Sequence, residues 1–229
     1  MGNLRNWIIV GVGCCALVLA TFGNVGAESI EGSVRARANA STEAESSSDG
    51  FYWQVWNGAL PERRPTDDHN DVLAVLTGRV TGPPIGCRFD FRGGALDPST
   101  VVGRTGSQVK LANRDAFTHE PAVEGLAGFT PLEVGPGKAR VISVPPGGPW
   151  VLSDRIYGHV EGHLHSMRDL IACAKVTQGG KFRFDGVPPG TYSLRILRGP
   201  EQVASRRVTV SAERTLRVDP LTMKKRRGN

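Results

Sequence analysis

Four of the five histidines in the chain fall in two short segments. His119 follows the alternating run at 108–112, and the second segment holds His159, His163 and His165. Side chains two positions apart on a strand point to the same side, about 6.5–7 Å apart, so His163, His165 and Met167 would share one face. Imidazole suits copper or zinc, and a thioether beside imidazole favours copper. These residues predict a histidine-rich metal site, and a chance cluster of surface histidines is the alternative.

The remaining histidine, His69, lies in the charged, proline-bounded segment 61–71, next to several aspartates. We predict a solvated loop there, with a weak cation site as the alternative. The sequence contains no GxGxxG, P-loop, GxSxG or HExxH motif. A catalytic role would therefore depend on a three-histidine metal site that activates water or oxygen, with Glu120 or Glu161 as the base.

The N-terminal segment has the organisation of a secretory signal. An apolar run at 7–22 is followed by Val25 and Ala27, which are small residues where signal peptidase requires them. We predict a signal peptide at 1–27 and a periplasmic or secreted protein that begins at Glu28. An uncleaved membrane anchor is the alternative, although the run of ~16 residues is shorter than the roughly 20 that span a bilayer. Membrane contact is expected only through this segment.

Export changes how the cysteines are interpreted. Cys14 and Cys15 would leave with the signal, so the mature chain keeps Cys87 and Cys173. Two cysteines in an oxidising compartment favour one disulfide bond. Two separate buried thiols are the alternative.

Composition and periodicity both indicate a β protein. The 29 glycines and 15 prolines are typical of a turn-rich chain, and the net charge of +6 is spread too thinly to indicate nucleic-acid binding. Apolar or alternating segments recur between Gly and Pro turns, at 72–77, 108–112, 139–144, 181–184, 192–197, 206–210 and 214–218. This pattern predicts an all-β fold, either one β-sandwich or two in series.

Two further segments are expected to lie outside the sandwiches. Residues 28–71 are predicted to be a disordered connector, because 28–50 are rich in Ser, Ala and Glu and lack aromatic residues. Within the connector, 51–56 (FYWQVW) form an aromatic patch that could bind a sugar or a partner, or pack as a short strand. Residues 222–229 form a basic tail, predicted to be solvated, with contact to anionic lipid as the alternative.

Three motifs resemble those of one known family, namely Asn113-x-Asp115-x-x-x-His119, the turn Pro136-Gly137 and the run at 180–192 (GKFRFDGVPPGTY). Over roughly 75–221 the chain is similar to exported plastocyanin-like proteins, in which a cupredoxin domain precedes a carboxypeptidase regulatory-like β-domain. The resemblance implies a cupredoxin-like β-sandwich at 72–168, followed by a small transthyretin-like (Ig-like) β-sandwich at 169–221.

The same resemblance implies where the copper ligands of the family would fall. His119 takes the place of the first copper histidine, and counting back from Val176 places the second at His159. By that count the cysteine ligand falls on Ile156 and the methionine ligand on Gly162, and neither residue binds a metal through its side chain. Because a blue-copper site needs the thiolate, the resemblance implies the fold but not ordinary electron transfer.

Three functions are compatible with these observations. In the first, His119 and His159, with His163, His165 or Met167, bind copper or zinc for storage, delivery or sensing. In the second, no metal is bound and the β-domains form a binding or scaffolding module of the cell envelope, with an envelope protein as partner. In the third, the histidine-bound metal is catalytic. A metal ion is the main expected partner.

Overall fold

The computed structural model describes residues 29–35, 71–80, 82–212 and 215–224. These residues form strands and turns with no helix among them, which confirms the predicted all-β fold. In this part of the chain no helix is long and apolar enough to cross a membrane. The predicted signal peptide, the aromatic patch at 51–56, His69 and residues 225–229 lie outside the described residues.

A four-stranded antiparallel sheet stands in the middle of the molecule. Its strands in spatial order are β11 (Leu170–Lys175), β2 (Val72–Thr77), β13 (Gly190–Arg198) and β14 (Glu201–Val210). Every residue of β2 is buried, because Ala74 and Leu76 point into one core while Leu73 and Val75 point into the other. The continuous apolar run of β2 is typical of a strand that is covered on both faces.

The first core lies between the middle sheet and a small outer sheet. The outer sheet contains β12 (Lys181–Asp185), β1 (Ser29–Arg35) and β15 (Leu216–Arg217), with β16 (Leu221–Thr222) also beside β1. In β12, alternation places Phe182 and Phe184 in this core and leaves the charged Lys181, Arg183 and Asp185 exposed.

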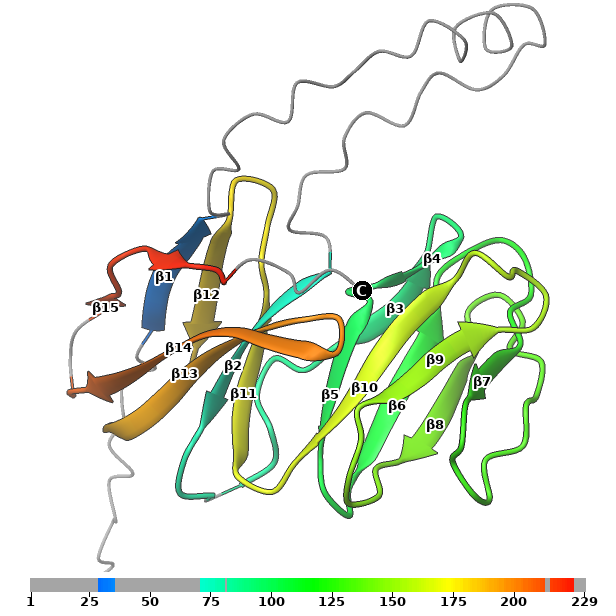
Figure 1. Cartoon of the computed structure of the whole chain (residues 1–229), viewed down its shortest axis with the longest axis horizontal. Helices are drawn as coiled ribbons and strands as arrows, with labels where there is room; N and C mark the ends of the chain where they lie inside the picture. Colours follow the sequence, from blue (N-terminus) through cyan, green and yellow to red (C-terminus); the bar gives the residue numbers. More distant parts are fainter. Residues whose placement is uncertain (1–28, 36–70, 81, 213–214, 225–229) are drawn as a thin grey trace, which may run out of the picture.

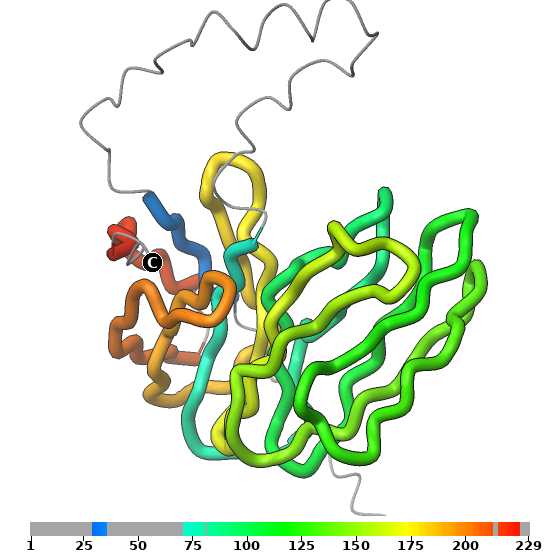
Figure 2. The backbone as a smooth tube through the Cα atoms, turned by 45° about the vertical axis from the view of Figure 1, so that its right-hand side comes forward, coloured from blue at the N-terminus to red at the C-terminus, as the bar shows by residue number. Residues whose placement is uncertain are grey.

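The second core is enclosed by two further sheets and by the other face of the middle sheet. One sheet has the order β4 (Ala95–Asp97), β3 (Phe89–Arg92), β6 (Gln108–Asn113) and β8 (Ala139–Ser143). The other has the order β5 (Thr100–Arg104), β10 (Glu161–Met167), β9 (Trp150–Asp154) and β7 (Pro121–Val123). These strands, β3 to β10, lie on the right of Figure 1. The tube in Figure 2 shows them beside the group formed by the middle and outer sheets.

The path of the chain differs from two sandwiches in series. The chain enters the middle sheet through β2, builds β3 to β10, and returns to the middle sheet through β11. Val72–Thr77 therefore pairs with strands that we assigned to 169–221, and the expected boundary between the two domains does not describe the fold. The disulfide Cys87–Cys173, which confirms the predicted bond, joins the start of this excursion to the strand that ends it.

The strand β1 corrects part of the predicted connector at 28–71. Ile30 and Val34 are buried in the first core, and the backbone of β1 pairs with β12 and β15. Gly32 lies against the ring of Phe182, where a Cβ would come within 2.4 Å of Cζ. Two apolar residues among polar ones were too weak a pattern to predict a strand. The basic tail also starts later than the predicted residue 222, because Met223 is still buried in the first core.

Candidate functional site

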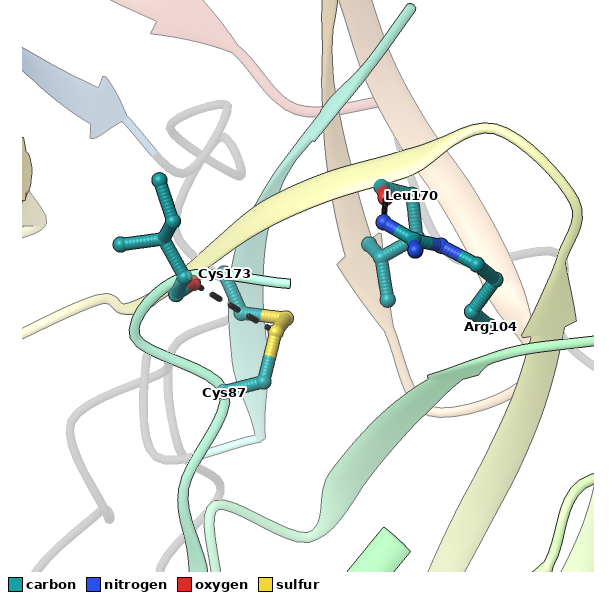
Figure 3. The surroundings of a disulfide bond; sticks show 5 residues. Cys87, Arg104, Leu170 and Cys173 are labelled. Carbon is teal, nitrogen blue, oxygen red and sulfur yellow. Dashed lines mark hydrogen bonds between the residues drawn. A yellow bond between two sulfur atoms is a disulfide. The ribbon is translucent and has the colours of Figure 1, made fainter. Parts of the chain in front are cut away.

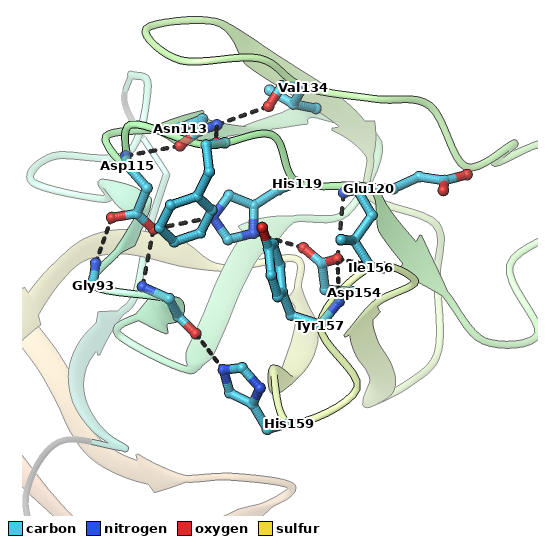
Figure 4. Close-up of polar contacts among 12 residues, drawn as sticks. Gly93, Asn113, Asp115, His119, Glu120, Val134, Asp154, Ile156, Tyr157 and His159 are labelled. Carbon is cyan, nitrogen blue, oxygen red and sulfur yellow. Dashed lines mark hydrogen bonds and ion pairs between the residues drawn. The ribbon is translucent and has the colours of Figure 1, made fainter. Parts of the chain in front are cut away.

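His119 is fully buried at one end of the second core. It follows β6 by a short loop, and its backbone forms a bridge with Val134. Its ring stacks on Phe91 with 4.4 Å between centroids, and the rings of Phe117 and Tyr157 pack at 5.1 and 5.4 Å. The imidazole is therefore held by aromatic rings, as Figure 4 shows in part.

Both ring nitrogens of His119 face a carboxylate. Nδ1 lies 2.6 Å from Oδ2 of Asp154, and Nε2 lies 3.0 Å from Oδ2 of Asp115. The side chains of His119 and Asp154 are inaccessible to solvent, and that of Asp115 is 7% exposed. Each ring nitrogen of His119 therefore has a carboxylate oxygen within hydrogen-bond distance. We call these three residues the Asp–His–Asp network.

Backbone amides hold both carboxylates in place. The N–H groups of Gly93 and Gly94, in the turn between β3 and β4, donate to Asp115 at 2.5 and 3.0 Å. Burial by itself would raise the pKa of Asp115, but these two amides and His119 outweigh it, so the pKa lies below its ordinary value. Asp154 accepts from the backbone N–H groups of Ile156 and Tyr157 at 2.8 and 3.1 Å.

Asn113 shapes the loop that carries the network. Its side-chain amide donates to the carbonyls of Phe117 and Val134, both at 2.7 Å, and its Oδ1 accepts from the N–H of Asp115 at 2.8 Å. In the Asn-x-Asp-x-x-x-His run, the Asn therefore fixes the loop, and the Asp bonds the histidine.

His159 lies at the same end of the molecule but in a different environment. It is exposed, and its Nε2 donates to the carbonyl of Gly94 at 2.9 Å. Because the N–H of Gly94 bonds Asp115, this backbone unit connects His159 to the network. The structure thus brings His119 and His159 close together through Asp115, without a direct contact between the two rings.

The other three predicted ligands lie elsewhere. His163, His165 and Met167 do share one face of β10, but Nε2 of His165 donates to the carbonyl of Gly199 at 2.7 Å, in the turn between β13 and β14. Burial lowers the pKa of His165, with the Gly199 carbonyl acting against this shift and His163 adding to it. Met167 packs against the second core. These residues therefore contribute to the contact between β10 and the middle sheet.

On its Nδ1 side, His119 leaves no room for copper or zinc. A metal ion about 2 Å from a nitrogen and from an oxygen holds those atoms about 3 Å or more apart, whereas Nδ1 of His119 and Asp154 are in direct hydrogen-bond contact. Both cysteines of the described chain are in the disulfide, so neither supplies a thiolate. Among the described residues, no group of three His, Cys, Asp or Glu side chains is arranged to hold a metal ion.

Asp154 is the site residue that the sequence analysis missed. The resemblance placed the lost cysteine ligand at Ile156, but Ile156 is 45% exposed, and the residue that faces His119 is Asp154, at the end of β9. One signal was available. Leu152 and Asp154 are two positions apart on a strand, so Asp154 continues the buried face and requires a polar partner.

Comparisons with known proteins find cupredoxins among solved structures. No protein-family model and no curated protein matches the chain. A copper-containing nitrite reductase from Thermus scotoductus SA-01 matches 38% of this chain at 19% identity and a TM-score of 0.32, and the match spans only 23% of that protein. An amicyanin mutant in its Cu(I) form matches 41% of this chain and 98% of its own, at 15% identity and a TM-score of 0.33. Likenesses of this size assign neither a site nor a function to the chain.

Proposed function

We propose that the protein is an exported β-sandwich binding or scaffolding module that works without a metal at His119. The observation that carries this proposal is the Asp–His–Asp network, in which both ring nitrogens of His119 are already bonded to carboxylates. Histidine here stabilises the end of a sandwich, where a cupredoxin would carry its metal.

Exposed apolar side chains at the same end support a role in binding. Phe117, which packs on His119, is 40% exposed, and Ile156, whose N–H bonds Asp154, is 45% exposed. Leu132, two residues before Val134, is 57% exposed. Phe117 and Ile156 are both tied to the Asp–His–Asp network, and exposed apolar residues at one site favour contact with a partner, which we propose to be a protein of the envelope.

Export is part of this proposal. The disulfide Cys87–Cys173 is of the kind that persists in an oxidising compartment. The strand β1 begins at Ser29, directly after the predicted cleavage site at Ala27. N-terminal sequencing of protein from the extracellular or periplasmic fraction should find Glu28 first, and retention of Met1 on membrane-bound protein would contradict cleavage.

Copper or zinc binding is the second candidate, and one observation favours it. His119, Asp115 and His159 converge through Gly94 at one end of the second core. Binding there would require one ring nitrogen of His119 to break its carboxylate contact, while the other nitrogen could keep its own. Cu(II) would then give no intense blue band, because both cysteines of the described chain form the disulfide. His163, His165 and Met167 would not take part.

Metal titration separates the two candidates. Cu(II) and Zn(II) are titrated by calorimetry into the wild type and into His119→Ala, His159→Ala and His69→Ala, with circular dichroism as a check of folding. The proposal expects equal, weak binding in all four proteins. One tight equivalent that is lost in His119→Ala and His159→Ala, but kept in His69→Ala, would replace it with the metal-binding function.

A further inference from the structure

A cavity of about 330 Å³ lies where the strands β3 to β10 meet the middle sheet, close to the disulfide. It is bounded by the segment before β3, by the end of β5, by the start of β6 and by the first residue of β11. Its accessible lining includes Pro83, Pro84, Arg104, Gln108 and Lys110. This cavity is on a different part of the fold from the Asp–His–Asp network, and nothing in the proposed function uses it.

Arg104 brings an incompletely satisfied cation to this cavity. Its Nη2 donates to the carbonyl of Leu170 at 2.6 Å, as Figure 3 shows beside the disulfide. Its Nε is buried and has no hydrogen-bond acceptor within the described chain. Because Nε is inaccessible from the cavity, an anion bound beside Arg104 would accept from the outer N–H groups of the guanidinium, of which Nη2 already bonds Leu170.

The charges around the cavity have a single sign. Arg104 and Lys110 are its two ionisable lining residues in the described part of the chain, and neither is acidic. Gln108 and Lys110 alternate with the buried Val109 on β6, so their side chains point away from the core. An anion that enters the cavity therefore meets two positive charges and amide donors, and no carboxylate repels it.

The remaining walls and the size of the cavity restrict the ligand further. Pro83 and Pro84 supply accessible apolar surface, whereas Phe89 and Leu170 are buried behind the wall of the cavity. The volume of about 330 Å³ corresponds to about eleven waters at roughly 30 Å³ each, which suits a small molecule and not a folded partner. A bare inorganic anion would leave these apolar walls unused.

We propose that this cavity binds a small organic carboxylate, with the carboxylate accepting hydrogen bonds from Arg104 and the apolar body lying against Pro83 and Pro84. Guanidinium is well suited to this role, because it donates to a carboxylate in a fixed planar geometry. Lys110 adds a second positive charge to the lining of the cavity.

The test uses the purified whole protein with three probes of known chemistry. Hexanoate, 1-hexanol and inorganic phosphate are titrated by calorimetry, and Tm is recorded with each. Hexanoate should bind and, at about ten times its Kd, raise Tm by about 3–6 °C. Hexanol lacks the charge and phosphate lacks the apolar body, so both should bind at least about tenfold more weakly.

Variants assign the binding to this cavity. Arg104→Gln should weaken hexanoate binding by about tenfold or more, since it removes a charge-assisted hydrogen bond. Lys110→Gln leaves the hydrogen bond from Arg104 to the Leu170 carbonyl intact and should weaken hexanoate binding about threefold. This variant keeps the test decisive if Arg104→Gln does not fold. Lys138→Gln removes another exposed lysine outside the cavity and should have no effect. No hexanoate binding, equal binding of hexanol or phosphate, or full binding in both cavity variants would overturn the proposal.

Discussion

The behaviour of His119 depends on two carboxylates that are far from each other in the sequence. Asp115 is four residues before it, on the same loop, and Asp154 arrives from β9 on the other sheet. The aromatic rings of Phe91 and Tyr157 exclude water from the contact. In such surroundings each charge stabilises the others, and removing one leaves the rest uncompensated.

Removing the imidazole should therefore cost much more than removing the neighbouring histidine. His119→Ala leaves Asp115 and Asp154 buried without the ring that both of them contact, and we expect it to lower the free energy of unfolding by about 3–5 kcal/mol. His159→Ala removes an exposed side chain with one hydrogen bond and should cost about 1 kcal/mol or less. Urea denaturation measures both values, and equal small effects would show that the network contributes little.

His165 should make stability depend on pH in a defined direction. Its pKa in the folded protein lies below the ordinary value of about 6.5 because the ring is buried, despite its bond to Gly199. The folded state therefore favours the neutral ring. The contribution of His165 to the free energy of unfolding is complete above about pH 6.5. It declines as the pH falls below that value, because the unfolded chain then takes up a proton that the folded chain does not.

The matched variant for this effect is His165→Asn, which keeps a side-chain donor near Gly199 but does not titrate. Unfolding free energies between pH 7.5 and 5.5 should fall less steeply in the variant than in the wild type, by up to about 1.4 kcal/mol per pH unit. Identical slopes would mean that His165 titrates freely in the folded protein.

At the scale of elements, prediction from sequence succeeded where one strand carries its own pattern. The alternating run at 181–184 and the apolar run at 72–77 are strands in the structure, as β12 and β2. The strand β1 was missed because its stability comes from pairing with β12 and β15, which are more than 140 residues away. Asp154 was missed for the same reason, since only the fold places it beside His119.

A glycine substitution tests whether β1 is an integral strand. The Cβ of Gly32→Ala would lie 2.4 Å from Cζ of the buried Phe182 ring, so we expect a loss of about 1–3 kcal/mol in unfolding free energy. Gly135→Ala is the matched control, because its Cβ would have no neighbour within 4 Å. If both substitutions are neutral in chemical denaturation, β1 behaves as a connector and not as part of the first core.

At the scale of the whole molecule, the two cores share one sheet. Leu73 and Leu76 lie on opposite faces of β2, so a change in this strand reaches both cores. The chain leaves this sheet after β2 and returns in β11, and the disulfide closes that excursion over a sequence separation of 86 residues. The motifs of the resemblance could not predict this order, because they describe local runs and not how the strands pair.

Opening this covalent link should destabilise the whole fold. The double variant Cys87→Ser with Cys173→Ser frees a long loop in the unfolded chain, and we expect a loss of about 3–5 kcal/mol in the chain-entropy picture. The same loss should follow reduction of the wild type by dithiothreitol. A denaturation midpoint that reduction leaves unchanged would contradict a structural role for the bond.

The central claim is that the ring of His119 is committed to Asp115 and Asp154 and is therefore withheld from metal. Nuclear magnetic resonance of selectively ¹⁵N-labelled histidine observes this ring directly, with His119→Ala used to assign its signals. We predict an exchange-protected N–H signal at Nδ1, bonded to Asp154, that keeps its position and intensity after one equivalent of Zn(II) is added. Loss of that N–H signal on adding zinc, with zinc-dependent shifts at both His119 and His159, would show that the site binds metal.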